Sequence, residues 1–222
     1  MKPIKIGNRL ESLAKYIYSE DRVIDVGCDH AKLDIFLVQS GIVNKVYVCD
    51  VNPNALQNGI NNIEKYDLAR NIIPILSYGI EKISSLDVNT VIISGMGSAN
   101  IIGILSSPNL DRVYKLVLQS NNNHYELRKF LTSRGFTIVA EEVVKDGKKT
   151  YVNIIAFRLD RAKTYTEMEY EFGPELIKMK ENLDYFKELK DSYEDILYAS
   201  RNDELREKIK WLESIIENLE RE

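Results

Sequence analysis

Residues 22–31 read Arg-Val-Ile-Asp-Val-Gly-Cys-Asp-His-Ala, and this stretch decides the fold. Its first half is rich in β-branched residues, which is typical of a buried strand. The strand leads into Gly27, which lies between the carboxylates of Asp25 and Asp29. A strand that ends at a glycine turn before a helical pattern is typical of the first βα unit of a doubly wound α/β sheet. We therefore predict an α/β fold with a ligand site at the end of this strand.

The sequence on both sides of this stretch alternates between short apolar runs and helical patterns. Such alternation favours right-handed βαβ units, and therefore a parallel sheet covered by helices on both faces. The predicted parallel strands are 22–26, 45–49, 72–76, 90–94 and 114–118. The predicted helices are 8–18, 31–40, 53–66, 80–85, 98–106 and 123–134.

The alternation stops after residue 135. Two β-rich runs, 136–145 and 149–158, are joined by Asp146-Gly147, a dipeptide typical of a hairpin. We therefore predict a Rossmann-like, mostly parallel, seven-stranded sheet with an antiparallel hairpin at one edge.

Residues 161–222 differ in composition, and we place a domain boundary between residues 160 and 161. Residues 1–160 carry 19 Lys/Arg and 17 Asp/Glu, whereas residues 161–222 carry 11 and 17. Apolar residues recur every three or four positions in this tail, which favours an antiparallel helical hairpin with coiled-coil packing, broken near 201–203. The two seams are Phe172, Leu176, Met179, Leu183 and Phe186, then Leu205, Ile209, Leu212, Ile216 and Leu219. Such a hairpin either packs only against itself or forms an arm that binds a partner or substrate.

Composition excludes several classes of protein. A net charge of −4 over 222 residues excludes a strongly basic protein that holds nucleic acid by bulk charge. The two cysteines, Cys28 and Cys49, exclude a disulfide framework and disfavour zinc. The N-terminus lacks the apolar core of a signal peptide, and no apolar run approaches the about 18 residues of a membrane span. We expect a cytoplasmic protein, a monomer, without metal or membrane partners.

Polar and glycine residues follow all five predicted parallel strands. The carboxyl ends of such strands share one edge of the sheet, where ligands bind in open α/β folds. Turn chemistry explains any one of these clusters, but five at one edge favour a shared ligand site. The clusters are 25–31, Asp50, 77–79, 94–97 and 119–123.

The loop after the first strand favours a cationic ligand over a dinucleotide. A pyrophosphate needs the pattern Gly-x-Gly-x-x-Gly, but Asp29 and Lys32 stand where its second and third glycines would be. Asp25 and Asp29 would repel phosphate and attract a cation such as the sulfonium of S-adenosyl-L-methionine. Asp50 stands at the right place to accept both hydroxyls of a ribose. The pattern favours S-adenosyl-L-methionine over NAD.

Three motifs together resemble the bacterial TrmK-type tRNA (adenine-N1)-methyltransferases. They are 25–31, the Ser-Gly-Met-Gly turn at 94–97 and Leu-Gln-Ser-Asn at 118–121. The opening Asn-Arg-Leu at 8–10 and the heptad tail are similar too, so the resemblance covers most of the chain. It implies a class I methyltransferase fold with a C-terminal coiled-coil domain. It also implies methylation of N1 of adenine 22 in the D-arm of tRNA.

The resemblance and the strand-end positions together give candidate site residues. Asp29 would face the reacting base and stabilise its developing positive charge, and Asn121 would hydrogen-bond the base edge. The candidates for cofactor binding are Asp25, Gly27, Asp50, Val51, Asn52, Ser77, Tyr78, Gly79, Gly95, Met96 and Gly97. The candidates for substrate binding are Arg9, His30, Gln119, Arg128 and Lys129.

The chain departs from the family pattern at three positions. Tyr78 replaces an Asp that could contact the adenine amine of the cofactor, so Ser77 or backbone must substitute. Ser120 replaces a Pro, and Ser98 replaces the last Gly of a Gly-Met-Gly-Gly turn. Three other functions stay open: a class I methyltransferase for a small molecule or protein, a non-catalytic S-adenosyl-L-methionine-binding adaptor, and an NAD-dependent oxidoreductase.

Overall fold

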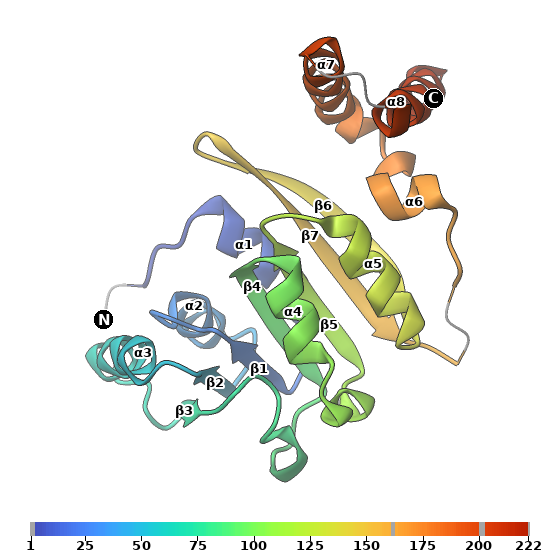
Figure 1. The fold of residues 1–222 in the computed structure, drawn as a ribbon. Coiled ribbons are helices and arrows are strands. Elements are labelled where there is room, and N and C mark those ends of the chain that lie inside the picture. Colours follow the sequence, from blue (N-terminus) through green and yellow to red (C-terminus); the bar gives the residue numbers. More distant parts are fainter. Residues whose placement is uncertain (1–2, 161–162, 200–202, 222) are drawn as a thin grey trace.

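The computed structural model describes residues 3–160, 163–199 and 203–221. Its centre is a seven-stranded sheet in the order β3-β2-β1-β4-β5-β7-β6, which confirms the predicted architecture (Figure 1). The first five strands pair in parallel, and β7 pairs antiparallel with both β5 and β6. The strands are β1 Val23–Val26, β2 Val46–Asp50, β3 Ile72–Leu76, β4 Thr90–Met96, β5 Lys115–Ser120, β6 Phe136–Asp146 and β7 Lys149–Arg158.

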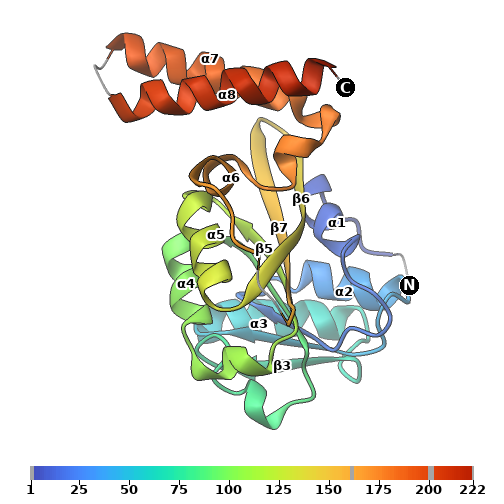
Figure 2. The same cartoon turned by 90° about the vertical axis from the view of Figure 1, so that its right-hand side faces the viewer.

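Helices cover both faces of this sheet because successive strand residues face opposite sides. In β4, Val91 and Ile93 pack into one apolar core with α4 and α5, whereas Ile92 packs into a second core with α1, α2 and α3. Figure 2 shows the two helix layers on either side of the strands. The helices are α1 Asn8–Ala14, α2 Lys32–Gln39, α3 Pro53–Lys65, α4 Ser98–Leu105 and α5 His124–Ser133.

Two of the predicted helices differ in the structure. The helix predicted at 80–85 is only a 3₁₀ turn, η1 Ile83–Ser85, and the helix predicted at 8–18 ends at Ala14. A second 3₁₀ turn, η2 Pro108–Arg112, follows α4. The hairpin predicted at Asp146-Gly147 is confirmed, with Gly147 at a φ of 62°.

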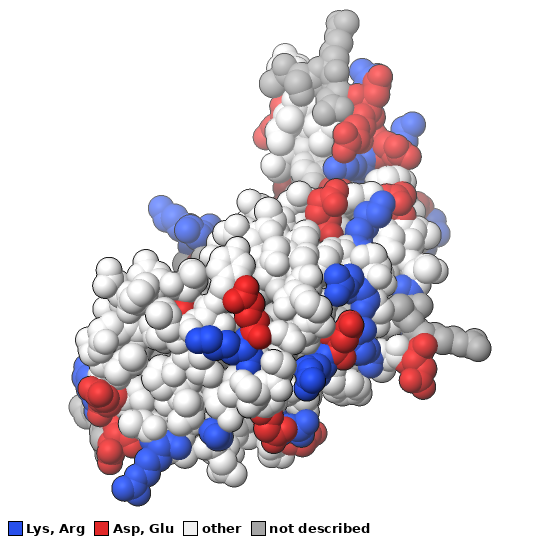
Figure 3. All heavy atoms as spheres, turned by 60° about the horizontal axis from the view of Figure 1, so that its bottom comes forward, with Lys and Arg blue, Asp and Glu red and all other residues white. Residues whose placement is uncertain are grey.

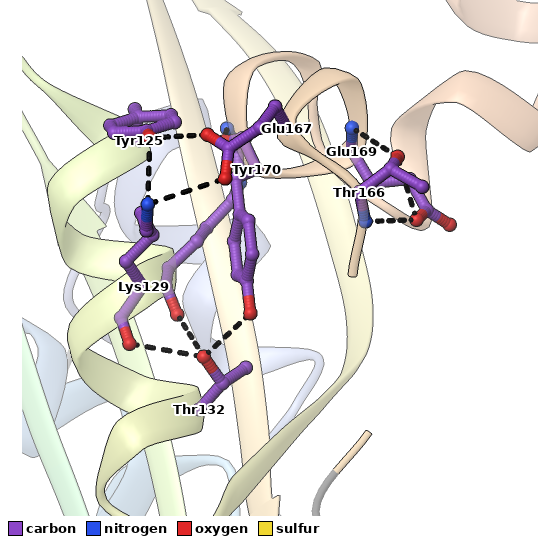
Figure 4. Close-up of polar contacts among 8 residues, drawn as sticks. Tyr125, Lys129, Thr132, Thr166, Glu167, Glu169 and Tyr170 are labelled. Atoms are coloured by element: carbon purple, nitrogen blue, oxygen red, sulfur yellow. Dashed lines mark hydrogen bonds and ion pairs between the residues drawn. The ribbon is translucent and has the colours of Figure 1, made fainter. Parts of the chain in front are cut away.

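The tail begins with a short helix that packs on α5, in the layer that covers one face of the sheet. This helix, α6 Glu167–Phe172, opens with a capping box in which Thr166 and Glu169 bond each other's backbone N–H (Figure 4). The hydroxyls of Thr132 on α5 and Tyr170 on α6 lie 3.0 Å apart. The segment that contains α6 therefore packs on α5 beside the sheet, while Phe172 at its end also contacts Phe186 of the hairpin that follows.

The helical hairpin consists of α7 Leu183–Ala199 and α8 Asp203–Arg221, which run antiparallel side by side (Figure 2). Ile209, Leu212 and Leu219 of the second predicted seam are buried, as expected. The seam predicted from Phe172 to Phe186 as one continuous helix is wrong. Gly173, with a φ of 97°, and Pro174 end α6, and the 3₁₀ turns η3 Leu176–Lys178 and η4 Lys180–Asn182 precede α7. The break between the two helices was predicted near residues 201–203, of which 201 and 202 lie outside the described residues.

No helix in the part of the chain that the structure describes is both long and apolar enough to cross a bilayer. The domain boundary predicted between residues 160 and 161 adjoins residues 161–162, which the structure does not describe.

Candidate active site

Two adjoining cavities lie at the carboxyl edge of the parallel strands. Gly27, Asp50 and Met96 line both cavities, so the two form one continuous region. The β3 cavity, of about 330 Å³, is also lined by Val26, Val51, Ser77, Tyr78, Gly79, Ala99, Asn100, Gly103 and Ile104. The β1 cavity, of about 400 Å³, is also lined by Arg9, Leu10, Asp25, Cys28, Asp29, His30, Lys32, Leu33, Ser94 and Gly95. The predicted meeting of strand ends thus produces a two-part site.

The loop after β1 holds an unusual backbone. Gly27 has a φ of 79° and donates its N–H to the carbonyl of Cys49 on β2 at 2.8 Å. Asp29 and Ala31 also have positive φ, 44° and 50°, which residues with a Cβ adopt rarely. Gly59 on α3 permits this shape, because a Cβ there would lie 2.9 Å from the carbonyl oxygen of Asp29. Such strain concentrates at functional sites.

Asp25 and Asp34 form a buried carboxyl pair beneath the β1 cavity. Asp25 is 5% exposed and Asp34, in the first turn of α2, is 0% exposed. Burial raises the pKa of Asp25 to about 7, while a hydrogen bond with Asp34 and the nearby Arg9 oppose the rise. Burial, and then the charge of Asp25, hold the pKa of Asp34 well above its usual range. The pair therefore retains a proton at neutral pH.

Asp29 lines the same cavity. Its side chain is 62% exposed, and its Oδ2 lies 3.6 Å from Nε2 of His30. The amide of Asn62 on α3 donates to the carbonyl of His30 at 3.0 Å and fixes the loop from behind. Asp29 is therefore an exposed carboxylate on a strained, braced loop that lines the β1 cavity.

Asp50 ends β2 between the two cavities. Its Oδ1 accepts the backbone N–H of Asn52 at 2.8 Å, and its Oδ2 makes no hydrogen bond to another described residue. The side chain of Asn52 instead caps α3, because its Oδ1 accepts the N–H of Asn54 at 2.8 Å. Asn52, predicted as a cofactor contact, does not line either cavity; Gly97 does not either.

A hydrogen-bond network joins α1 to the ends of β4 and β5. Oε1 of Gln119 accepts from Nη1 of Arg9 at 3.0 Å and from the N–H of Gly95 at 3.1 Å. Nδ2 of Asn121 donates to the carbonyl of Gly95 at 2.8 Å, and its Oδ1 accepts from Nε2 of Gln119 at 3.2 Å. The guanidinium of Arg9 also lies over the ring of Tyr151. The network holds Arg9 at the rim of the β1 cavity.

Two residues predicted to bind substrate do not fit that role. Gln119 is fully buried, and its amide is engaged by the network, so it positions Arg9 and Gly95. Arg128 is 2% exposed, donates to Glu141 at 2.8 Å, and also donates to the carbonyls of Tyr170 and Glu171. A guanidinium buried in this way cannot reach a phosphate. Sequence patterns do not reveal this, because Arg is mostly exposed in proteins.

Lys129 lies on the outside of α5, away from the two cavities. Its Nζ donates to the hydroxyl of Tyr125 at 2.8 Å and lies 3.4 Å from Glu167 (Figure 4). These bonds, first the one with Tyr125, raise the pKa of Lys129.

Two polar residues of the site were not predicted. Asp34 stands inside the apolar run 33–38, where a carboxylate conflicts with burial, and that conflict is the signal that could have found it. Asn100 lies on α4 and lines the β3 cavity, but its position in a helix gave no sequence signal.

A larger cavity, of about 850 Å³, lies between α5, α6 and the hairpin. Its lining includes Glu126, Glu171, Glu207, Tyr193 and Trp211, so its charge is mostly negative. On the face drawn in Figure 3, Lys and Arg alternate with Asp and Glu among the described residues, and no basic patch dominates. Neither surface resembles a simple phosphate-binding groove.

The residues of the two cavities fit S-adenosyl-L-methionine. Carboxylates suit a ligand that carries positive charges and ribose hydroxyls. The site offers those of Asp29 and Asp50, with the buried pair of Asp25 and Asp34 beneath them. A phosphate would meet these carboxylates without a glycine-rich cradle. The buried Oγ of Ser77, which has no hydrogen-bond partner among the described residues, provides a further polar contact in the β3 cavity.

Comparison with known proteins agrees with this chemistry. The model of a methyltransferase domain matches residues 6–155. The tRNA (adenine(22)-N(1))-methyltransferase of Bacillus subtilis is 26% identical over 231 residues, which cover 99% of this chain and 97% of that protein. A putative tRNA methyltransferase of Mycoplasma genitalium is 29% identical over 177 residues, or 78% of this chain and 79% of that protein.

A solved structure is similar along almost the whole chain. It is a putative tRNA (m1A22) methyltransferase from Streptococcus pneumoniae in complex with S-adenosyl-L-methionine, with a TM-score of 0.86 and 28% identity. The match covers 96% of this chain and 100% of that one, so it includes the helical hairpin. The chain therefore belongs to the methyltransferase-domain family, and within it to the TrmK-type tRNA (adenine(22)-N(1))-methyltransferases.

Proposed function

We propose that this protein transfers a methyl group from S-adenosyl-L-methionine to N1 of adenine 22 in the D-arm of tRNA. The observation that carries the proposal is the carboxylate-lined, two-part site at the strand ends, in a chain that matches a tRNA methyltransferase over 99% of its length. The protein acts in the cytoplasm as a monomer, and the α7–α8 hairpin is a coiled-coil arm that contacts RNA.

The residues of the site divide between binding and reaction. The bound cofactor supplies an electrophilic methyl group on a sulfonium. Asp50 accepts the ribose hydroxyls, and Gly27 lets the loop backbone approach the ligand. Asp25, supported by Asp34, faces the positively charged end of the cofactor. The family cofactor positions Val51, Ser77, Tyr78, Gly79, Gly95 and Met96 line the two cavities.

The reaction needs no strong base, because N1 of adenine has a free lone pair. Catalysis therefore comes from orientation and from a preorganised electrostatic field. Asp29 stabilises the positive charge that develops on the methylated ring and accepts a hydrogen bond from its amine. His30 contacts the base edge, and Arg9 contacts the RNA at the rim. Asn121, predicted to hydrogen-bond the base, lines neither cavity, and its amide instead holds the turn at Gly95. The base must leave its stack to reach this site.

The test is incubation with S-adenosyl-L-methionine and unmodified tRNA, followed by nucleoside mass spectrometry and primer extension. N1 methylation blocks Watson–Crick pairing, so extension should stop at position 22. Asp50→Ala should weaken cofactor binding about 10- to 100-fold in calorimetric titration, the value of charge-assisted hydrogen bonds. Methylation of a small molecule or protein in place of tRNA would contradict the proposal, as would cofactor binding without any transfer.

A further inference from the structure

The β3 cavity contains a polar atom whose partner is missing from the described residues. Ser77 is 7% exposed, and its Oγ makes no hydrogen bond to another described residue. An unpaired buried hydroxyl is costly, so such a group indicates that a ligand completes its hydrogen bonding. Ser77 lines the cavity, where a ligand would meet it.

A second free polar group lines the same cavity. Asn100 stands in α4, its side chain is exposed, and no hydrogen bond joins its amide to another described residue. Ser77 and Asn100 come from different elements, the end of β3 and the first turns of α4. The lining of this cavity therefore includes a hydroxyl from one element and a primary amide from another.

The cofactor's base falls in this cavity if Asp50 holds the ribose. The backbone N–H of Ser77 donates to the carbonyl of Asp50 at 3.1 Å, so the two residues are neighbours at the edge. Beyond Asp50 the cavity walls are largely apolar, with Val51, Ala99 and Ile104, which suits the faces of a flat aromatic ring. The only carboxylate among its described lining residues is Asp50 itself.

The chemistry of these groups determines which base is accepted. A carboxylate only accepts hydrogen bonds, so it favours a 6-amino purine and rejects a 6-oxo purine. A hydroxyl and a primary amide each donate and accept hydrogen bonds, so they can bond to the 6-amino purine or to the 6-oxo purine. We propose that Ser77 and Asn100 recognise the edge of the cofactor's base, and that the protein consequently binds 6-amino and 6-oxo purine nucleosides of this type with similar affinity. This inference rests on the proposed use of S-adenosyl-L-methionine.

The test is calorimetric titration of the full-length protein with S-adenosyl-L-homocysteine and with its 6-oxo analogue, S-inosyl-L-homocysteine. The wild-type affinities should agree within about 10-fold. Asn100→Leu and Ser77→Ala should each weaken both ligands by about 10-fold. Asn100→Asp should keep the amino ligand but weaken the oxo ligand by about 100-fold, because two acceptors would then face each other.

Asn58→Leu is the matched control, since Asn58 is also an exposed helical asparagine but lines neither cavity. The proposal is overturned if Asn100→Leu binds both ligands as tightly as wild type, or if wild type prefers the amino ligand by more than about 100-fold. Binding of neither ligand by the wild-type protein would overturn the cofactor assignment, and this inference with it. Circular dichroism of each variant excludes misfolding as the cause of a loss.

Discussion

At the scale of single residues, Asp29 combines a strained backbone with an exposed carboxylate. We expect Asp29→Asn to lower kcat about 100-fold, because the preorganised charge is lost in the transition state, while cofactor affinity stays unchanged. Asn adopts positive φ readily, so this substitution removes the charge without disturbing the loop. Single-turnover kinetics and calorimetric titration separate the two effects.

Asp67→Asn is the matched control, because Asp67 also has a positive φ, 55°, but lies outside the site. A wild-type single-turnover rate in Asp29→Asn, with collapsed cofactor affinity, would instead make Asp29 a cofactor ligand.

The buried pair of Asp25 and Asp34 makes stability depend on pH. Both carboxyls bind protons more tightly in the folded chain, so the free energy of unfolding falls as pH rises from about 4 through about 7. Asp34→Asn removes one of the two acids and leaves an amide that donates to Asp25. We expect this variant to be more stable than wild type at pH 8, on the order of 2 kcal/mol, with little difference near pH 4.

Urea unfolding across this pH range, without cofactor, measures the difference. The exposed Glu64→Gln on α3 should show no such dependence. A constant difference between wild type and Asp34→Asn at all pH values would mean that the pair holds no extra proton.

At the scale of elements, every strand was predicted within two residues of its observed bounds, because buried strands carry dense β-branched runs. The helix predicted over the first tail seam, from Phe172 to Phe186, was wrong for a local reason. Its 4-3-4-3 spacing is real, but Gly173 and Pro174 interrupt it, and backbone restriction outweighs periodicity. Phe172 and Leu176 are nonetheless buried, so the apolar pattern predicted burial correctly and the helix wrongly.

The candidate site was predictable to a similar degree. The strand ends with their carboxylates follow from topology, since parallel strands present one common edge. The burial of Arg128 and Gln119 does not follow, because it depends on where α6 and α1 pack. Asn100 was missed since a helix surface carries many polar residues without function.

A buried ion pair joins α5 to β6 and holds the arginine that also bonds the backbone of α6. Arg128 and Glu141 are both nearly inaccessible, and Glu141 also accepts the N–H of Glu175 at 3.1 Å. We expect Arg128→Met to destabilise the protein by about 3–5 kcal/mol, because it leaves a buried carboxylate unpaired. The double variant with Glu141→Leu should recover much of this loss in urea unfolding.

Lys129→Ala, one position along α5, serves as the comparison and should change stability by less than about 1 kcal/mol. A smaller loss for Arg128→Met than for Lys129→Ala would contradict a structural role for the pair.

At the scale of the whole molecule, the α7–α8 hairpin is joined to the sheet and its covering helices through a shared apolar core. Phe172 contacts both Phe186 on α7 and Trp211 on α8. We expect the fragment 1–182 to bind S-adenosyl-L-methionine but lose most tRNA methylation, and to melt below the full chain because Phe172 becomes exposed. The fragment 1–160 should be less stable again, by about 3 kcal/mol or more, since Arg128 loses its two carbonyl partners.

Thermal unfolding of the three proteins, with cofactor titration and tRNA methylation, measures this order. Full tRNA activity in 1–182 would leave the hairpin without a role in RNA binding. Equal melting temperatures of the two fragments would favour the boundary at residue 160.

The network around Arg9 has a consequence for synthesis on the ribosome. Arg9 bonds Gln119, and its backbone N–H bonds Asp146 at 3.4 Å, so one of the first residues made depends on partners translated 110 and 137 positions later. During translation α1 can form, but its arginine has no fixed place until β5 and the β6–β7 hairpin have emerged. Because domains fold largely as units, the site is completed only when most of the chain has left the exit tunnel. A nascent chain stalled before the β6–β7 hairpin should therefore lack an organised rim for RNA, so an incomplete enzyme cannot hold tRNA productively.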